Sequence, residues 1–427
     1  MFNRPRGTED ILPNVSHVWQ NVENSFHNIC QNFGYKEIRT PLFERTEVFL
    51  RGIGNNADIV QKEMYTFLDK GQRSMTLKPE GTASIVRCYI ENNMQYDAKS
   101  NKLYYITPCY RYERPQIGRL REFHQFGVEN LGSEQAICDS EVISLSYFFL
   151  ESLGIKNLIL LINSIGCENC RDVYKIKLKD YFGKYIDNLC SNCKTRINKN
   201  PMRILDCKKC FENLNREIID NSPKMIKNLC EDCLFHFENV KKNLENIGVK
   251  YQIDSKIVRG LDYYTRTVFE IICDIEEIKF SICGGGRYNG LVKELGGNST
   301  CGMGFGIGIE RLIHVLYKQN IVILEEKTPL LFVIGMNDLE IMAAQKVVYA
   351  CRLNGIFAEM DLMNRSVKVQ MKYANKIGSK FVMVIGKKEI ESNKVKIKNM
   401  KTKNENEIVL NFANIKDDVY KILKMIV

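Results

Sequence analysis

Hydrophobic positions in the first third of the chain follow two periods, one typical of helices and one typical of strands. Apolar residues recur at helical spacing in three segments that we predict to be helices: 15–33, 46–52 and 133–153. Two segments rich in aromatic and β-branched residues, 102–111 and 123–132, are predicted strands. Because a polar loop with Pro115 and Gly118 separates them, we expect an antiparallel hairpin.

The predicted secondary structure changes twice along the rest of the chain. Residues 167–248 show short helical patches without a clean strand, and strand character returns at 249–253 and 264–273. Farther on, predicted strands and helices alternate over 329–335, 339–353, 356–362, 367–377 and 381–385. Such alternation is typical of a small, mostly parallel α/β domain. We therefore divide the chain into 1–166, 167–247, 248–325 and 329–427, with a linker near 317–329.

Composition narrows the class of protein. With 427 residues, of which 44% are hydrophobic and 26% charged, the chain resembles an average globular protein of two or three domains. This excludes disordered, collagen-like and membrane-embedded chains. No run of about 18 apolar residues is present to span a bilayer, and the N-terminal segment lacks the apolar run of a signal peptide. We expect a cytoplasmic protein without a membrane partner.

The excess of basic residues is concentrated near the end of the chain. The formal net charge is +10, and from Leu331 onward 17 Lys and Arg face 10 Asp and Glu. This asymmetry favours a module that binds a polyanion. A solvated, Lys-rich surface explains the charge equally well, so charge alone does not decide between the two.

Eight of the sixteen cysteines form Cys-x2-Cys pairs: Cys167/Cys170, Cys190/Cys193, Cys207/Cys210 and Cys230/Cys233. Nineteen residues separate Cys170 from Cys190, and nineteen separate Cys210 from Cys230. This spacing is typical of tetrathiolate zinc sites. We expect structural zinc to organise a segment too polar for a core of its own, in two sequential or two interleaved sites. The alternative is that helix packing folds the segment and the thiols stay free.

The predicted hairpin carries a constellation that suits a nucleotide. Residues two apart on a strand share a face, so Arg111 projects with Glu113, and Phe123 projects with Gln125 and Glu129. An arginine can bind phosphate and a phenylalanine can stack on a base. On these residues alone, an ordinary polar sheet face is the stronger interpretation.

Three further motifs are suggestive but weak when taken singly. The turn at 79–83 carries a carboxylate, and the segment 258–270 combines an arginine with two tyrosines that could surround a small zwitterion. Glycines at 284–286 and at alternate positions over 302–308 permit close backbone approach to a ligand or tight strand packing. Neither glycine run matches a P-loop or a dinucleotide fingerprint.

Taken in order, these segments resemble the class II aminoacyl-tRNA synthetases, and among them the histidyl-tRNA synthetase family. The matching segments span nearly the whole chain: 5–13, 40–44, 110–127, 259–270, 284–291 and 302–312. Asn289 stands where the family pattern leads us to expect Asp. The resemblance implies an α/β (α+β) class II catalytic domain, an antiparallel sheet flanked by helices with a small inserted domain. It also implies a C-terminal α/β anticodon-binding domain and a homodimer joined near 40–44.

The resemblance also implies a reaction. Histidine and ATP would form histidyl-adenylate, and the histidyl group would pass to tRNA(His), releasing AMP and diphosphate. Arg111 and Arg259 would be the catalytic residues, with Arg259 bridging the α-phosphate and the histidine carboxylate. ATP, accompanied by Mg²⁺, would meet a set of residues from the hairpin and the last motif: Arg111, Glu113, Arg121, Phe123 and Arg311.

The remaining roles concern the amino acid and the tRNA. The residues implied to bind histidine, besides Arg111 and Arg259, are Glu80, Gly81, Thr82, Gln125, Glu129, Tyr263 and Tyr264. Glu129 and a tyrosine hydroxyl would recognise the imidazole, and Gln116 and Arg119 would approach the tRNA acceptor end. A site that hydrogen-bonds a polar side chain rejects apolar analogues about 10⁴–10⁵-fold, so we do not interpret 167–247 as an editing domain.

Three other functions compete with histidine–tRNA ligation. A catalytically silent, synthetase-like regulatory subunit of histidine biosynthesis is the first, although both the tail and the Arg259 segment are present here. A class IIa synthetase for glycine, threonine or proline is the second, and Glu129 argues against it. A purely nucleic-acid-binding protein is the third, and it would not need arginines in a hairpin beside a separate pocket.

Overall fold

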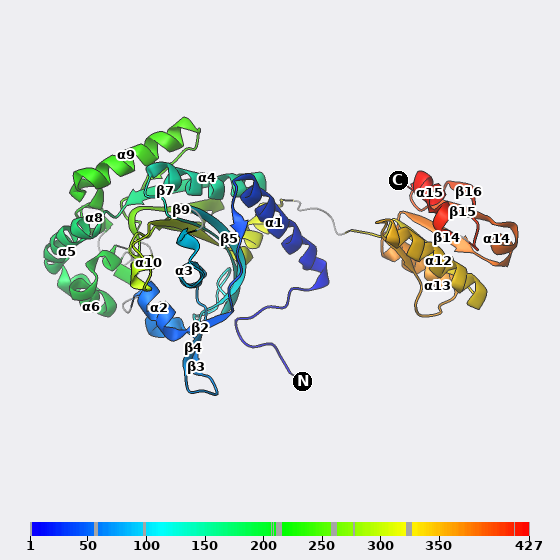
Figure 1. The fold of residues 1–427 in the computed structure, drawn as a ribbon, viewed down its shortest axis with the longest axis horizontal. Helices are drawn as coiled ribbons and strands as arrows, with labels where there is room; N and C mark the ends of the chain where they lie inside the picture. Colours follow the sequence, from blue (N-terminus) through cyan, green and yellow to red (C-terminus); the bar gives the residue numbers. More distant parts are fainter. Residues whose placement is uncertain are drawn as a thin grey trace. The chain divides into compact units, whose positions relative to one another are not determined.

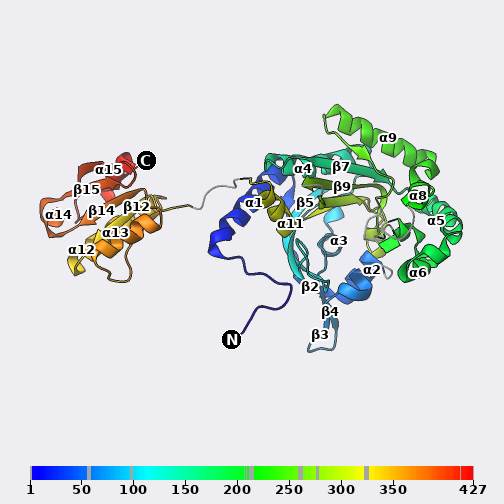
Figure 2. The ribbon, with the colours of Figure 1, turned by 180° about the vertical axis from the view of Figure 1, so that it is seen from behind.

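The computed structural model describes residues 2–54, 59–96, 100–205, 207, 209–210, 216–257, 263–275, 278–321, 327–413 and 415–426. The chain forms two compact units, residues 1–324 and 325–427 (Figure 1, and from behind in Figure 2). The two units are described separately below.

An eight-stranded sheet organises the first unit, in the order β1-β5-β6-β11-β10-β9-β7-β8. Its strands are β1 (Lys36–Glu37), β5 (Asn101–Tyr110), β6 (Glu122–Leu131), β7 (Leu158–Ser164), β8 (Gln252–Ile253), β9 (Thr265–Ile275), β10 (Ile278–Arg287) and β11 (Gly302–Gly308). Neighbours are antiparallel except in the two edge pairs, β1/β5 and β7/β8. This confirms the expected antiparallel class II sheet. A small sheet, β2-β4-β3, lies beside it, with β2 (Phe43–Arg45), β3 (Thr66–Leu68) and β4 (Ser74–Leu77).

The two faces of the large sheet pack against different helices. One face is covered by α1 (Pro13–Asn32), α4 (Ala136–Ser152) and α11 (Ile309–Lys318). Phe26 of α1 stacks on Phe126 of β6, with ring centroids 4.4 Å apart. The other face carries α3 (Thr82–Glu91) and α10 (Leu291–Glu294), and α2 (Thr46–Ile53) packs against these two helices. The first face is therefore closed by an apolar core, and the second is only partly covered.

The hairpin prediction is confirmed. Strands β5 and β6 pair antiparallel from Asn101↔Leu131 to Tyr110↔Glu122. The burial of Phe126 and Val128 against α1 and α4 turns Phe123, Gln125 and Glu129 to the opposite face.

The insertion is helical, as expected, but its interior differs from the prediction. Helices α5 (Glu168–Gly183), α6 (Ser191–Lys199) and α8 (Arg216–Asp220) gather beyond one end of the sheet (Figure 1), while α9 (Glu231–Asn246) packs along α4. The prediction that this segment is too polar for a core was wrong. Apolar side chains from several of its helices are buried together: Tyr174, Leu178, Phe182, Leu189, Ile197, Met202 and Ile204.

The second unit is a five-stranded sheet, β13-β12-β14-β15-β16. Strands β12 (Leu331–Gly335), β13 (Ala358–Met360) and β14 (Phe381–Ile385) are parallel, and helices α12 (Asp338–Leu353), α13 (Val367–Lys376), α14 (Lys387–Ser392) and α15 (Ile415–Ile426) accompany the sheet. Strands β15 (Lys394–Asn399) and β16 (Glu405–Val409) extend it antiparallel and were not predicted. Their Lys side chains face Glu405 and Glu407, so part of the basic excess is paired within the sheet.

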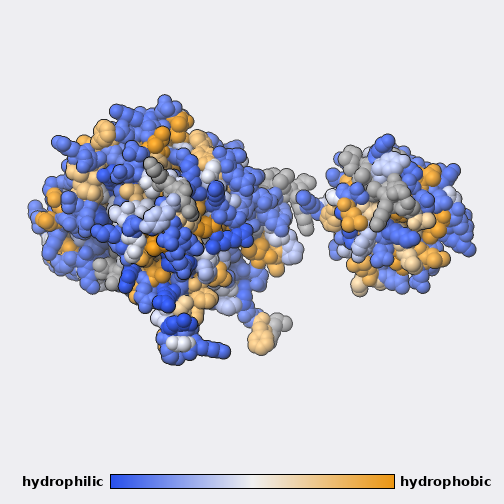
Figure 3. Space-filling model, viewed as in Figure 1, coloured by the Kyte–Doolittle hydropathy of each residue, from blue (hydrophilic) through white to orange (hydrophobic). Residues whose placement is uncertain are grey.

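None of the helices in the described ranges is long and apolar enough to cross a membrane. On the face of the molecule seen in Figure 3, hydrophilic residues predominate and hydrophobic ones form scattered groups.

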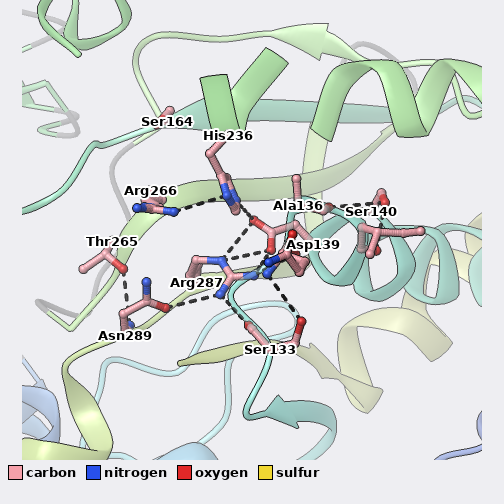
Figure 4. A network of polar contacts seen from close by, with 12 residues as sticks. Ser133, Ala136, Asp139, Ser140, Ser164, His236, Thr265, Arg266, Arg287 and Asn289 are labelled. Carbon is pink, nitrogen blue, oxygen red and sulfur yellow. Dashed lines mark hydrogen bonds and ion pairs between the residues drawn. The ribbon is translucent and has the colours of Figure 1, made fainter. Parts of the chain in front are cut away.

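A buried ion pair ties the insertion to the sheet (Figure 4). Arg287 at the end of β10 donates from Nε to Asp139 of α4 at 2.9 Å and from Nη1 to the carbonyl of Ser133 at 2.8 Å. His236 of α9 contacts the same carboxylate at 2.8 Å. Arg287 and Asp139 have no exposed side-chain surface. Burial alone would raise the pKa of Asp139, but the Arg287 charge lowers it.

Loss of Arg287 should therefore destabilise the first unit strongly. Arg287→Ala leaves the Asp139 carboxylate buried without its counter-charge, and we expect the free energy of unfolding to fall by about 3–5 kcal/mol. Arg39→Ala removes an exposed ion pair with Glu37 and should change the free energy of unfolding far less, because solvent screens that pair. Urea unfolding measures both. Equal, small effects would contradict the role assigned to the buried pair.

Candidate active site

The candidate site lies on the partly covered face of the sheet, above a floor of glycines. In the strand register, Gly304 of β11 lies opposite Glu129 of β6, and Gly306 lies opposite Gly127. A Cβ on Gly304 would lie 2.0 Å from Glu129 Oε2, and one on Gly306 would lie 2.2 Å from Gln125 Nε2. The glycines therefore let long polar side chains of the neighbouring strand lie across the sheet.

Glu129 is the centre of a cluster of hydroxyl groups. Its Oε1 accepts hydrogen bonds from Thr82 Oγ1 at 2.7 Å and from the Tyr105 hydroxyl at 3.3 Å. Its Oε2 accepts one from the Tyr288 hydroxyl. The carboxyl is buried, and burial raises its pKa to about 8 although these hydroxyls act in the opposite direction. Glu129 therefore titrates close to neutral pH.

The segment that precedes α3 brings the next predicted residues to this cluster. Both oxygens of buried Glu80 accept backbone N–H groups at 2.8 Å, one from Thr82 and one from Ala83. The backbone N–H of Gly81 donates to Gln125 Oε1 at 3.0 Å. Glu80 thus fixes the start of α3 and, with it, the hydroxyl that contacts Glu129.

Two predicted tyrosines also reach the cluster. The Tyr263 and Tyr264 rings are 4.7 Å apart, and Tyr263 lies 5.7 Å from the Tyr288 ring. Tyr263 is buried and also contacts the Thr82 side chain. Arg259, the predicted second catalytic arginine, lies outside the described residues.

Arg111 lies at the other end of the same segment. Its Nε donates to the carbonyl of Pro79 at 2.8 Å, one residue before Glu80. Its guanidinium lies over the Phe123 ring, 5.2 Å from the centroid. Residues 79–82 therefore connect the arginine to the Glu129 cluster along one continuous stretch of backbone.

Several arginines lie close together near Arg111, at the end of the site away from Glu129. Arg311 of α11 is anchored by a 2.7 Å hydrogen bond to the carbonyl of Ser281. Burial lowers the pKa of the Arg311 guanidinium, and the charges of Arg119 and Arg111 lower it further, while Glu113 opposes the shift. Guanidinium groups held together against their repulsion form a strong anion site.

The loop of the hairpin holds the remaining predicted residues. Arg121 donates to the carbonyl of Glu113 at 3.3 Å and lies over the Tyr112 ring at 4.0 Å. Arg119 pairs with the Glu113 carboxylate at 3.6 Å, and its backbone forms a bridge with Gln116. All four predicted hairpin-loop residues therefore lie near the arginine end of the site.

Sequence reasoning missed two residues of the Glu129 cluster, Tyr105 and Tyr288. Glycines mark the places where they fit: a Cβ on Gly127 would lie 2.0 Å from the Tyr105 ring, and one on Gly302 would lie 2.1 Å from the Tyr288 ring. An isolated glycine on a strand signals such an approach, but it does not name the side chain that occupies the space.

The eight paired cysteines form two clusters in an arrangement that neither prediction described. Cys167 and Cys170 join Cys230 and Cys233, while Cys190 and Cys193 join Cys207 and Cys210. The sites are therefore nested, with the outer pairs together and the inner pairs together, rather than sequential or interleaved. The outer pairs meet at the N-terminal ends of α5 and α9, where the backbone N–H of Cys230 donates to Cys170 Sγ at 3.1 Å.

Comparison with known proteins identifies the family. A family model for histidyl-tRNA synthetase matches residues 7–168 and 198–312. The chain belongs to the histidyl-tRNA synthetase family. A model for an anticodon binding domain matches residues 324–416, which lie almost entirely in the second compact unit. Histidyl-tRNA synthetase domains and an anticodon-binding domain are thus both present.

The similarity extends over nearly the full length of known family members. The chain is 51% identical over 406 residues to the histidine--tRNA ligase of Acetivibrio thermocellus, covering 95% of this chain and 97% of the relative. It is 50% identical over 420 residues to that of Caldanaerobacter subterraneus, covering 98% and 99%. Among solved structures, apo histidyl-tRNA synthetase of S. aureus superposes with a TM-score of 0.83 at 39% identity, covering 98% of this chain and all of that one.

The glycine floor gives a direct test of the site. Gly304→Ala places a Cβ against Glu129 and 2.4 Å from the carbonyl oxygen of Val128, so we expect it to lower the free energy of unfolding by about 1–3 kcal/mol. At Gly308, on the same strand, a Cβ would meet no atom of the described residues within 4 Å. Gly308→Ala is the control and should lower the free energy of unfolding by less than Gly304→Ala does. Urea unfolding compares them, and equal stability of the Gly304 variant and the unmodified protein would contradict the packing described.

Proposed function

We propose that this protein ligates L-histidine to tRNA(His) in two steps. ATP and histidine first form histidyl-adenylate and diphosphate, and the histidyl group then passes to the terminal ribose of the tRNA, releasing AMP. The observation that carries this proposal is the buried Glu129 cluster, which residues 79–82 connect to Arg111, itself close enough to Arg311 to affect its pKa. Membership in the histidyl-tRNA synthetase family supports it.

The Glu129 cluster suits an imidazole. A neutral imidazole offers one N–H donor and one acceptor. The carboxylate has about four acceptor positions, and three are taken by the hydroxyls of Thr82, Tyr105 and Tyr288. The remaining position is available for the ring N–H, and a hydroxyl of the Tyr263–Tyr264 pair would donate to the other ring nitrogen.

The other end of the site suits ATP. We assign stacking of adenine to Phe123 and Arg311, and contact with its exocyclic amine to Glu113. Attack of the histidine carboxylate builds negative charge at the α-phosphate, which Arg111 and Arg259 would stabilise; such preorganised charge is usually the largest catalytic contribution. Arg121 would hold the outer phosphates, together with the Mg²⁺ that accompanies ATP as part of the substrate. Positioning of the two substrates against each other would provide the rest of the rate enhancement.

We further propose the partners and location that follow from this activity. The basic second unit would bind the anticodon stem-loop, while Gln116 and Arg119 of the hairpin loop would approach the acceptor end. The protein would act in the cytoplasm as a homodimer.

Amino-acid-dependent exchange of labelled diphosphate into ATP tests the function. We expect exchange with histidine and none with glycine, threonine or proline. Exchange without transfer to tRNA(His) would contradict the second step. Absence of exchange with any amino acid would overturn the proposal and favour a silent regulatory subunit, for which the relatives named above give no support.

The pKa of Glu129 predicts a pH dependence. Because that pKa is raised to about 8, the free site holds a protonated carboxyl at lower pH and must lose the proton to accept an imidazole N–H. The KM for histidine should therefore fall as pH rises from about 6 to 8. Glu129→Gln should remove this dependence and raise KM about 10–100-fold, the loss of a hydrogen bond to a charged group.

Glu122→Gln is the matched control, because Glu122 is on the same strand and contacts Tyr110 rather than the cluster. The imidazole of free histidine titrates near pH 6.5 in every case, so the difference between the two variants isolates Glu129. An unchanged pH profile in Glu129→Gln would contradict the assignment.

Truncation tests whether the second unit binds tRNA while the first unit alone carries out adenylate formation. Removal of residues 331–427 should raise the KM for tRNA far more than it slows diphosphate exchange, since phosphate contacts by Lys and Arg bind RNA. Aminoacylation and exchange rates measure the two effects. An equal loss of both would show that the second unit supports catalysis itself.

A further inference from the structure

The two cysteine clusters of the insertion have the dimensions of a single-ion site. In each, the four sulfur atoms lie within 4.8 Å of one another. Cys167 and Cys170 Sγ are 3.6 Å apart in the outer cluster, and Cys190 and Cys207 Sγ are 3.7 Å apart in the inner one. Four sulfurs placed tetrahedrally at the usual Zn–S distance of about 2.3 Å are separated by about 3.8 Å. The sulfurs are therefore already near their positions around one zinc ion.

Two other chemistries of four cysteines fit less well. A disulfide joins sulfurs at about 2.05 Å, and all eight thiols are free at these distances. An iron–sulfur cubane also takes four thiolates, but each binds a different iron, which spreads the sulfurs more widely than one shared ion does.

The backbone around both clusters favours thiolates. Cys167, Cys190 and Cys230 stand at the N-caps of α5, α6 and α9, where the helix dipole stabilises negative charge. Backbone N–H groups also point at sulfur: that of Cys230 at Cys170 Sγ, 3.1 Å away, and that of Cys190 at Cys210 Sγ, 3.4 Å away. Each of these bonds joins two pairs of the same cluster, so they independently support the nested arrangement.

The outer cluster is connected to the candidate amino-acid pocket. Arg171, one turn into α5, donates from Nη1 to the backbone carbonyl of Tyr264 at 2.6 Å. The N–H of Arg266 donates to the carbonyl of Gly166 at 2.8 Å. A Cβ on Gly166 would lie 2.5 Å from Cys170 Cβ. The start of α5 is thus packed directly against the segment that carries Tyr264.

We propose that the insertion holds two structural zinc ions in nested tetrathiolate sites, and that the outer ion positions Tyr264 in the histidine pocket through α5 and Arg171. The second half of this inference rests on the proposed function. The outer ion joins the N-terminal ends of α5 and α9, and the inner ion joins the N-terminal end of α6 to Cys207 and Cys210. Each ion displaces the thiol protons when it binds.

Metal analysis of the full-length protein tests the first half. Protein purified without added metal or chelator should contain close to two zinc ions per chain. X-ray absorption should show about four sulfur neighbours at about 2.3 Å. Less than about one zinc per chain, with titratable free thiols or disulfides in its place, would overturn the proposal. Absence of zinc would not decide the proposed function, which the diphosphate-exchange assay tests separately.

Paired substitutions test the nesting. Cys170→Ser with Cys233→Ser removes two ligands of one nested site and should leave about one zinc per chain. Cys170→Ser with Cys193→Ser damages both nested sites and should leave none. Sequential pairing reverses these two results, and interleaved pairing predicts no zinc in either variant. Because the insertion also has an apolar core, both variants should fold, and circular dichroism checks this.

Kinetics test the coupling to the pocket. Cys170→Ser with Cys233→Ser should raise the KM for histidine about fivefold, the loss of roughly one hydrogen bond, with little change in the KM for ATP. The double variant Cys193→Ser with Cys210→Ser loses the inner zinc and should change neither the KM for histidine nor the KM for ATP. Arg171→Ala should reproduce the rise in histidine KM with both zinc ions retained, and Arg171→Lys should restore part of it. A histidine KM that is the same in the outer-site, inner-site and Arg171 variants would overturn the coupling.

Discussion

A carboxylate buried on a sheet face is the constraint on which the site depends. Glu129 is buried away from the protein surface, and hydroxyls from α3, β5 and the segment after β10 donate to its carboxylate. These elements are far apart in the sequence, and the tyrosines among them reach Glu129 because Gly127 and Gly302 leave space for the Tyr105 and Tyr288 rings. Under the proposed function, selectivity for an imidazole would have the same origin, since a ligand that cannot donate an N–H would leave this carboxylate incompletely paired.

The sequence predicted those features that depend on short-range pattern. The β5–β6 hairpin and the shared face of Phe123, Gln125 and Glu129 follow from alternation and a polar loop. Tyr105 and Tyr288 could not be found in this way, because their contacts with Glu129 join residues 24 and 159 positions apart. Resemblance to a family supplied the roles of most residues, whereas periodicity supplied only their positions.

The errors have the same physical origin. All four cysteine pairs have the same Cys-x2-Cys form, which is compatible with any pairing. The nested pairing depends on contacts between the N-terminal ends of α5 and α9, which are distant in the sequence. The insertion seemed too polar because its apolar residues are dispersed among Lys and Asn, yet tertiary packing gathers them. Strands β15 and β16 were missed because few of their residues are apolar: Lys alternates with the buried Val395 and Ile397 in β15, and three polar residues begin β16.

A structure of the protein with histidine and a non-hydrolysable ATP analogue tests the central claim most directly. The account predicts one imidazole nitrogen within about 3 Å of the Glu129 carboxylate, with the ring beside Tyr263 and Tyr264 and the phosphates beside Arg111. A histidine whose ring lies away from Glu129, with that carboxylate still contacted only by the three hydroxyls, would contradict it.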